Sequence, residues 1–148
     1  MRGKLEDMAA SLGVTIEYVD LATRDGEYRH DLKRIRLRNG MTLRKEICAL
    51  AHELCHAVWG DVPSKFGPVH AKQERRADEW AAMLLITPER YRAAEERWDA
   101  HVGAIAYDLG VTTKIVLAFQ RLLARIGDDV YVDPRMGLGQ WAEKVPAG

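Results

Sequence analysis

Two histidines four residues apart, His52 and His56, have the types and the spacing that metal chemistry requires. Glu53 directly follows the first of them in the string AHELCHAVWG. On an α-helix, residues four apart lie about 40° apart on one face, because each residue turns the helix by about 100°. Both imidazoles can then reach one metal ion, and the neighbouring carboxylate can act as a general base. The string therefore predicts a zinc site with His52 and His56 as ligands and Glu53 as the base.

The helix that must carry this string has clear sequence boundaries. Thr42 is a suitable N-cap, and Gly60 is suited to end the helix just after Trp59. Six apolar residues form one stripe along it: Leu43, Ile47, Leu50, Ala51, Leu54 and Val58. The same five letters also arise by chance in unrelated helices. The stripe beside the two histidines favours a metal site over accidental surface histidines.

A catalytic zinc ion usually takes three protein ligands and leaves one position open. The longer pattern His-Glu-x-x-His-x-x-Gly-x-x-His would supply a third histidine, but Trp59 and Val62 stand at its last two defined positions. A glutamate from a second helix is the other common source. The candidates are Glu74 and Glu79, in the segment QERRADEWAAMLL.

Helical phase separates these two glutamates over a helix predicted at about residues 71–86. The small and apolar residues of this helix gather around Glu74: Ala77, Trp80, Ala81, Leu84 and Leu85. Glu79 falls on the opposite face with Arg75 and Ile86. A carboxylate in an apolar stripe is costly unless it is paired or binds a metal, so Glu74 is the expected third ligand. The alternative is a first-turn glutamate favoured by the helix N-terminus or paired with an arginine.

Hydrolysis of an amide would also need a donor for the developing oxyanion. The candidates for this role or for substrate contact are His70 and Tyr28, followed by His30 and Tyr91. His70 also has a phase similar to that of Glu74 and is an alternative ligand. Because two prolines and a glycine stand in residues 61–69, a position for His70 in a loop is the favoured interpretation.

The overall composition fits one compact domain. The chain has 148 residues, 47% of them hydrophobic, and its 22 basic and 22 acidic residues give a net charge of zero. This balance argues against a field that attracts nucleic acid or an anionic membrane. No apolar run is long enough to span a bilayer, and the N-terminal residues lack a signal-peptide core, so we expect a cytoplasmic protein. Cys48 and Cys55 are too far apart on one helix to form a disulfide.

Strand signals precede helix signals along the chain, which indicates an α+β fold. Residues 14–21 alternate β-branched and aromatic residues with polar ones. Ile35 and Leu37 alternate with arginines in the segment 27–40, which predicts a half-buried strand with a basic outer face. We expect this face to be solvated or to protect a sheet edge, rather than to bind an acidic partner.

The last third of the sequence predicts helices. Thr87 and Pro88 mark a helix start, and helix is expected from there to about residue 109 and again over 112–126. Residues 102–125 can also be interpreted as a helix-turn-helix unit with a turn at Gly110. Lys114 and Arg121 would then contact phosphates of DNA. Zero net charge and Asp108 beside the turn argue against DNA binding.

The combination of AHELCHAVWGD with the later segment ERRADEWAAMLLITP resembles the ImmA/IrrE-type metallopeptidases. The resemblance covers about residues 28–90. The second segment supplies its more specific part: Glu74, Ala77, Trp80, Ala81, Leu84, Leu85 and Pro88. The sequence departs from the pattern with Trp80 in place of a phenylalanine and with Ile86-Thr87 where a methionine is usual.

This resemblance implies a zincin-like α+β domain with a small antiparallel N-terminal sheet packed on the two ligand helices. We expect one domain over residues 1–126, with a core at about 14–90, C-terminal helices at about 88–126 and a tail over 127–148. It further implies Zn²⁺ on His52, His56 and Glu74, with Glu53 as the base. The expected partner is a protein substrate in a bacterial or phage-infected cell, such as a helix-turn-helix repressor of a phage or mobile element.

Overall fold

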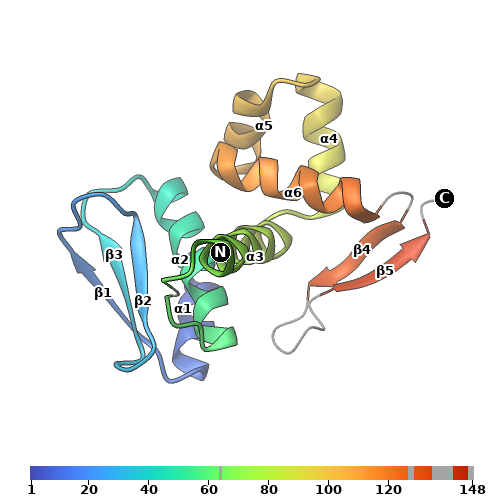
Figure 1. Ribbon diagram of the computed structural model, residues 1–148. Coiled ribbons are helices and arrows are strands. Elements are labelled where there is room, and N and C mark those ends of the chain that lie inside the picture. Colours follow the sequence, from blue (N-terminus) through green and yellow to red (C-terminus); the bar gives the residue numbers. More distant parts are fainter. Residues whose placement is uncertain (64, 127–128, 135–141, 147–148) are drawn as a thin grey trace. The chain divides into compact units, whose positions relative to one another are not determined.

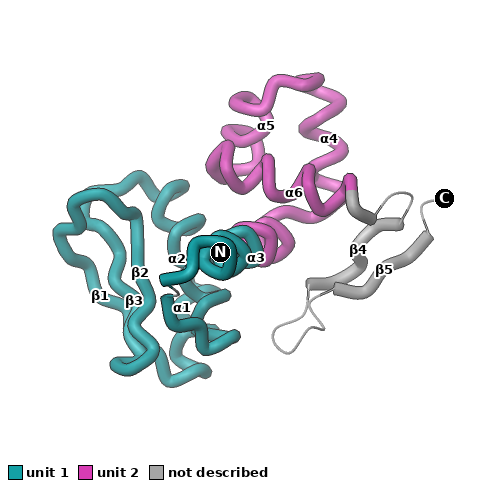
Figure 2. The backbone as a smooth tube through the Cα atoms, in the orientation of Figure 1, with its two compact units in different colours: residues 1–77 teal, residues 78–148 magenta. Residues whose placement is uncertain are grey.

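The computed structural model describes the chain except for residues 64, 127–128, 135–141 and 147–148. It divides into two compact units, residues 1–77 and 78–148, which are described separately (Figure 2). A single domain ending at residue 126 therefore remains a prediction.

Unit 1 contains a three-stranded sheet in the order β1-β3-β2 (Figure 1). Its strands are β1 (Thr15–Val19), β2 (Gly26–Arg29) and β3 (Arg34–Arg38). The prediction of an antiparallel sheet is correct for β2 and β3 but wrong for the parallel pair of β1 with β3. The single strand expected over 27–40 is two strands, because a turn at residues 30–33 folds β2 back onto β3. The sheet is therefore mixed.

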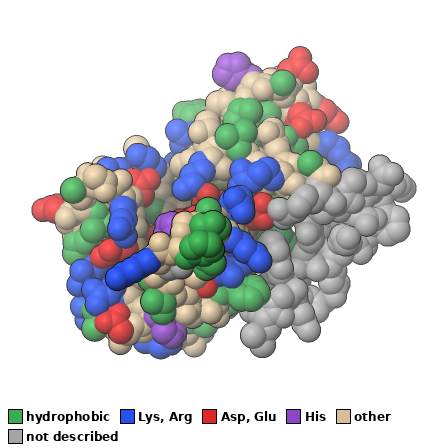
Figure 3. Space-filling model, in the orientation of Figure 1, with side chains coloured by type: hydrophobic (Ala, Val, Ile, Leu, Met, Phe, Trp, Pro, Cys, Tyr) green, Lys and Arg blue, Asp and Glu red, His purple; other side chains and the backbone are tan. Residues whose placement is uncertain are grey.

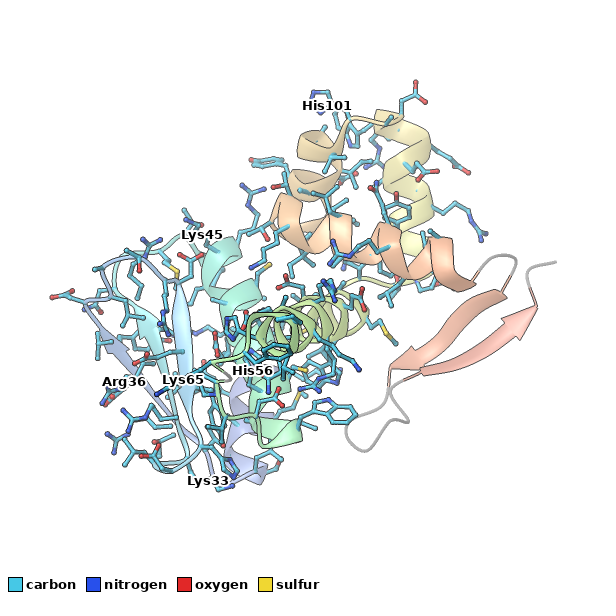
Figure 4. The ribbon with its side chains drawn as sticks, viewed as in Figure 1. Lys33, Arg36, Lys45, His56, Lys65 and His101 are labelled. Atoms are coloured by element: carbon cyan, nitrogen blue, oxygen red, sulfur yellow. The ribbon has the colours of Figure 1, made fainter. Side chains whose placement is uncertain are left out.

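The basic residues of β3 lie on a central strand and not at a sheet edge. In the register of the sheet, Arg36 stands between Glu17 on β1 and Glu27 on β2. Its side chain bonds to Glu17 at 2.8 Å and lies 3.5 Å from Glu27. Figure 4 shows Arg36 on the face away from the helices, and Figure 3 shows basic and acidic side chains intermixed over this side. The prediction that this face protects a sheet edge is therefore wrong, because β3 is the central strand, and acids on both neighbouring strands pair with Arg36.

The opposite face of the sheet is covered by two helices, α1 (Arg2–Ser11) and α2 (Leu43–Trp59). Ile35 and Leu37 of β3 are fully buried there. They form the core of unit 1 together with buried side chains of α1 and α2: Leu5, Ala9, Leu50, Ala51 and Leu54. The alternation of arginine with Ile35 and Leu37 therefore determines which face of the sheet α2 packs against.

The next helix, α3 (Gly67–Leu85), begins about one turn earlier than expected. Pro68 stands in its first turn, where its missing N–H costs no hydrogen bond. His70 therefore lies on a helix and is exposed, and its predicted position in a loop was wrong.

Unit 2 contains α4 (Pro88–Trp98), α5 (Val102–Leu109) and α6 (Thr113–Ile126). Thr87 caps α4 as predicted, with its side chain accepting from the N–H of Arg90. The continuous helix expected to residue 109 is interrupted at Asp99, which has a positive φ of 56°. The core of this unit includes buried apolar side chains of α5 and α6: Ile105, Ala106, Ile115, Val116, Phe119 and Leu122.

The segment after α6 was expected to be a tail, but it contains two antiparallel strands. These are β4 (Asp129–Pro134) and β5 (Ala142–Pro146). Among the residues that the structure describes, no single helix is long and apolar enough to cross a membrane. Two consecutive helical segments are long and apolar enough only when taken together, and they are bent by 102° relative to each other: Val102–Leu109 and Thr113–Ala124.

Candidate metal centre

Helix α2 carries three of the predicted site residues within one buried turn. Its ends agree with the sequence prediction: the Thr42 side chain accepts from the N–H of Lys45, and Gly60 ends the helix in the left-handed conformation at φ 65°. His52, Glu53 and His56 are each less than a tenth exposed. The two imidazole ring centres are 4.9 Å apart, as expected for side chains one turn apart on one face.

Helix α3 brings a carboxylate to the two imidazoles. One Glu74 oxygen lies 2.9 Å from Nε2 of His52, and the other lies 3.2 Å from Nε2 of His56. The two Nε2 atoms are 3.2 Å apart. Figure 4 shows His56 beside the α3 ribbon, in agreement with these contacts. The three residues predicted from the sequence as metal ligands therefore lie close together.

These atoms fit a tetrahedral metal ion. Zinc binds histidine nitrogen and carboxylate oxygen at about 2.0–2.2 Å, so two ligand atoms of one tetrahedron are about 3.3 Å apart. The two Nε2 atoms are 3.2 Å apart, close to this edge length, and one ligand atom from each of the three residues lies within 4.8 Å of the other two. Two imidazoles and one carboxylate are also the ligand types that catalytic zinc takes, with a position left open. The donor set thus fits zinc in number and chemistry, and its atoms are close enough together to bind one ion.

Glu53 lies beside this donor set but not in it. Its burial raises the pKa of the carboxyl, although the charges of His52 and His56 lower it in part. Strand β2 passes close by, since a Cβ built on Gly26 would be 3.2 Å from Cγ of Glu53. The result is a buried carboxylate that is a stronger base than an exposed one, as suits a group that must both accept and release a proton.

Contacts among the three proposed ligands also shift the pKa values of Glu74 and His56. Hydrogen bonds with His52 and His56 lower the pKa of Glu74 below its usual range. Burial lowers the pKa of His56, but its bond to Glu74, the charge of Glu53 and its bond to Asp61 outweigh that effect and raise the pKa. The Glu74 carboxylate thus favours the protonated form of His56.

Asp61, which was not predicted as a site residue, contacts the His56 ring at Nδ1, the ring nitrogen that does not face Glu74. Asp61 Oδ2 lies 2.8 Å from His56 Nδ1. The backbone N–H of Asp61 also donates to the carbonyl of His56 at 2.9 Å, which is the outer bond of a Schellman cap around Gly60. A glycine just after a helix, followed by a carboxylate, was the sequence signal for this contact.

Helix α3 differs from its predicted burial in two respects. Glu74 is not enclosed in an apolar stripe, since 39% of its side chain is exposed. Glu79 is the more buried residue at 4% exposure, and Arg121 lies 3.5 Å from it within unit 2. The prediction from helical phase holds only for a helix that buries one face along its whole length. In fact the face that carries Glu79 and Ile86 is buried in the second half of the helix.

The candidate oxyanion donors are distributed over the chain. The Tyr28 hydroxyl, buried on β2, lies 3.0 Å from Nδ1 of His30. The His30 ring approaches Gly60, where an added Cβ would be 3.4 Å away. His70 is exposed on α3. Tyr91 belongs to unit 2, where its hydroxyl accepts from Gln120 at 3.0 Å. Their predicted roles stay predictions.

An α+β domain with His-Glu-x-x-His on one helix and a facing glutamate on the next defines a zincin-like arrangement. The family model described as Peptidase_M78, IrrE N-terminal-like domain, matches residues 9–119. The chain belongs to this family, which confirms the resemblance drawn from its two motifs. None of the curated proteins compared with the chain matches it. Membership supports a metallopeptidase-type function.

Proposed function

We propose that the protein is a zinc-dependent endopeptidase that hydrolyses a peptide bond in a protein substrate. The observation that carries this proposal is the convergence of one ligand atom each from His52, His56 and Glu74, all within 4.8 Å of one another. Family membership supports peptide-bond hydrolysis as the class of reaction.

Zinc held by these three residues would supply Lewis-acid chemistry, activating a water molecule for attack and polarising the scissile carbonyl. Glu53 would handle the protons. It accepts a proton from the attacking water and then delivers that proton to the leaving amine nitrogen. Its raised pKa suits this role, because a carboxylate of ordinary pKa is a weaker base for the proton of the attacking water.

We further propose that the substrate is a helix-turn-helix repressor of a phage or mobile element. This part rests on the family to which the chain belongs. The test is to incubate the zinc-loaded protein with helix-turn-helix repressors from the same genome and to analyse the products by mass spectrometry. We expect one repressor to be cleaved at a defined bond by the wild type and not by Glu53→Gln at equal zinc content. Cleavage that persists in Glu53→Gln would exclude Glu53 as the base, and intact repressors throughout would overturn the proposed substrate.

The second candidate is a DNA-binding regulator or partner-binding module that keeps this fold. The bend of 102° between α5 and α6 falls in the range of about 90–120° typical of a helix-turn-helix. The candidate phosphate contacts are already paired, however. Lys114 lies 3.5 Å from Asp78, and Arg121 lies 3.5 Å from Glu79. A gel shift on duplex DNA that weakens with added salt would favour this candidate, and no shift is expected for a peptidase.

A further inference from the structure

Three residues outside the donor set connect the two ligand helices near the metal centre. They are Asp61, just after α2, Trp59, at the end of α2, and Arg76 on α3. An NH2 nitrogen of Arg76 donates to Oδ2 of Asp61. The Arg76 guanidinium also lies 4.6 Å from the centre of the Trp59 ring, within the range of a cation–π contact. We call these three residues the Asp61–Arg76–Trp59 clamp.

The clamp bonds directly to one proposed metal ligand, His56, and lies two residues along α3 from another, Glu74. Asp61 holds Nδ1 of His56 at 2.8 Å and bonds through its backbone to the His56 carbonyl. A histidine that donates from Nδ1 presents the lone pair of Nε2 to a metal ion. Arg76 stands two residues after Glu74 on the same helix, so fixing Arg76 also fixes the turn that carries Glu74.

Further contacts hold the same turn of α3 against the end of α2. Sγ of Cys55 lies 4.0 Å from the carbonyl oxygen of Arg76, and the Gln73 side chain donates to the carbonyl of Val62 at 3.4 Å. The Asp61 side chain is only 12% exposed, so its ion pair with Arg76 lies largely out of water. A buried ion pair adds little net stability compared with apolar packing, which makes a positioning role the better explanation of this pair.

We propose that the Asp61–Arg76–Trp59 clamp sets the geometry of the zinc site, with Asp61 orienting His56 and Arg76 tying that orientation to the position of Glu74. The inference rests on the zinc site of the proposed function. Asp61 and Arg76 are positioning residues, because neither side chain contributes an atom to the donor triangle. The clamp explains how the proposed ligands on two separate helices stay close together before a metal binds.

The test measures zinc affinity directly, by competition between the metal-free protein and a chromogenic chelator. Loss of a partner that orients a metal-bound histidine typically weakens metal binding by about 10- to 100-fold. We expect that loss for Asp61→Ala and for Arg76→Ala. Arg75→Ala is the matched control, because Arg75 is the neighbouring arginine of α3 and is exposed. Affinities of Asp61→Ala and Arg76→Ala equal to that of Arg75→Ala would overturn the proposal.

A double variant tests whether the two residues act as a unit. If Asp61 and Arg76 act through one clamp, Asp61→Ala combined with Arg76→Ala should lose no more affinity than the worse single variant. Losses that multiply would mean two independent effects and would contradict the clamp. Arg76→Lys keeps the charge but not the planar stacked fork, so its affinity should lie between those of wild type and Arg76→Ala.

Two further measurements separate positioning from folding. Thermal unfolding of each metal-free variant shows whether it is folded, and the visible spectrum of the cobalt-loaded form reports the geometry around the metal. The clamp predicts folded variants with an altered cobalt spectrum. Folded variants with wild-type spectra and affinities would exclude it. A folded wild type that binds no zinc would instead overturn the zinc site itself, and with it the proposed function.

Discussion

Asp61 bonds to His56 twice, once through its side chain at 2.8 Å and once through its backbone N–H at 2.9 Å. Both bonds depend on Gly60, which turns the chain back over the last turn of α2 at φ 65°. A residue with a side chain is strained at such a φ, so the glycine that ends the helix also positions the partner of the histidine. One local motif therefore ends α2 and orients His56.

The ion pairs of Glu74 with the two histidines predict how the metal-free protein responds to pH. Its bonds to the histidines lower the pKa of Glu74 from 4.5, so its contribution to stability is full above pH 4.5 and is lost as the pH falls. Folding raises the pKa of His56 from 6.5, so that contribution is full below pH 6.5 and is lost as the pH rises. The stabilisation should be fullest between these two values.

Thermal unfolding of metal-free wild type and Glu74→Gln can test this at about pH 5.5 and about pH 8. We expect the advantage of wild type over Glu74→Gln to be larger at the lower pH. A gap that grows towards the higher pH would show that these charges do not interact as described. Zinc affinity should follow the opposite trend, because protons compete with zinc for the histidine nitrogens.

Glu53→Gln should stabilise the metal-free protein at neutral pH. Burial raises the pKa of Glu53 from 4.5. The contribution of this residue to folding stability is therefore full below pH 4.5 and is lost as the pH rises through the raised pKa. A neutral amide of the same shape avoids burying a charge. We expect a gain on the order of 1 kcal/mol, or roughly 3–4 °C in Tm, at about pH 8. Unfolding curves that show no gain, or one that does not shrink towards about pH 4, would contradict this.

Gly26→Ala should disturb the site from the sheet side. The added methyl would lie 3.1 Å from Cδ2 of Leu37, 3.2 Å from the Arg36 carbonyl and 3.2 Å from Cγ of Glu53. The carbonyl cannot move without shifting β3, so we expect a loss of about 1–3 kcal/mol in unfolding free energy. Denaturant titration measures this, and peptidase activity should fall while zinc content stays unchanged.

Gly3→Ala is the control for Gly26→Ala, because nothing lies within 4 Å of a Cβ at Gly3 on helix α1. It should leave stability equal or slightly raised, since alanine favours helix more than glycine does. Equal stability of Gly26→Ala and wild type would show that β2 can move away from Glu53 without cost.

The sequence predicted best what local chemistry determines. Thr42 and Gly60 gave the ends of α2 because a cap depends on a few neighbouring residues. Helical phase placed His52 and His56 on one face for the same reason. Strand β2 was missed as a separate strand because it has only four residues and one buried side chain, Tyr28. The parallel pairing of β1 with β3 joins residues far apart in the sequence, which no local pattern encodes.

Glu74 and Glu79 show where helical phase alone is insufficient. Phase identified the glutamate that meets the histidines, but it treated Glu79 as needing no partner. Glu79 is nevertheless buried, and Arg121 of α6 pairs with it. The burial of each α3 residue depends on what packs against that part of the helix, and this information lies outside the helix. Asp61 lies beyond the end of α2, so the helical periodicity of α2 gives no information about its contact with His56.

The central claim is that His52, His56 and Glu74 hold one zinc ion. The most direct test is the zinc content of the purified protein after dialysis, measured by mass spectrometry for wild type, Glu74→Gln and Glu79→Gln. Both substitutions replace a glutamate of α3 with its amide, five residues apart. We predict one zinc per chain in wild type and in Glu79→Gln, with most of the zinc lost in Glu74→Gln. Full zinc content in Glu74→Gln, or its loss in Glu79→Gln alone, would contradict the account.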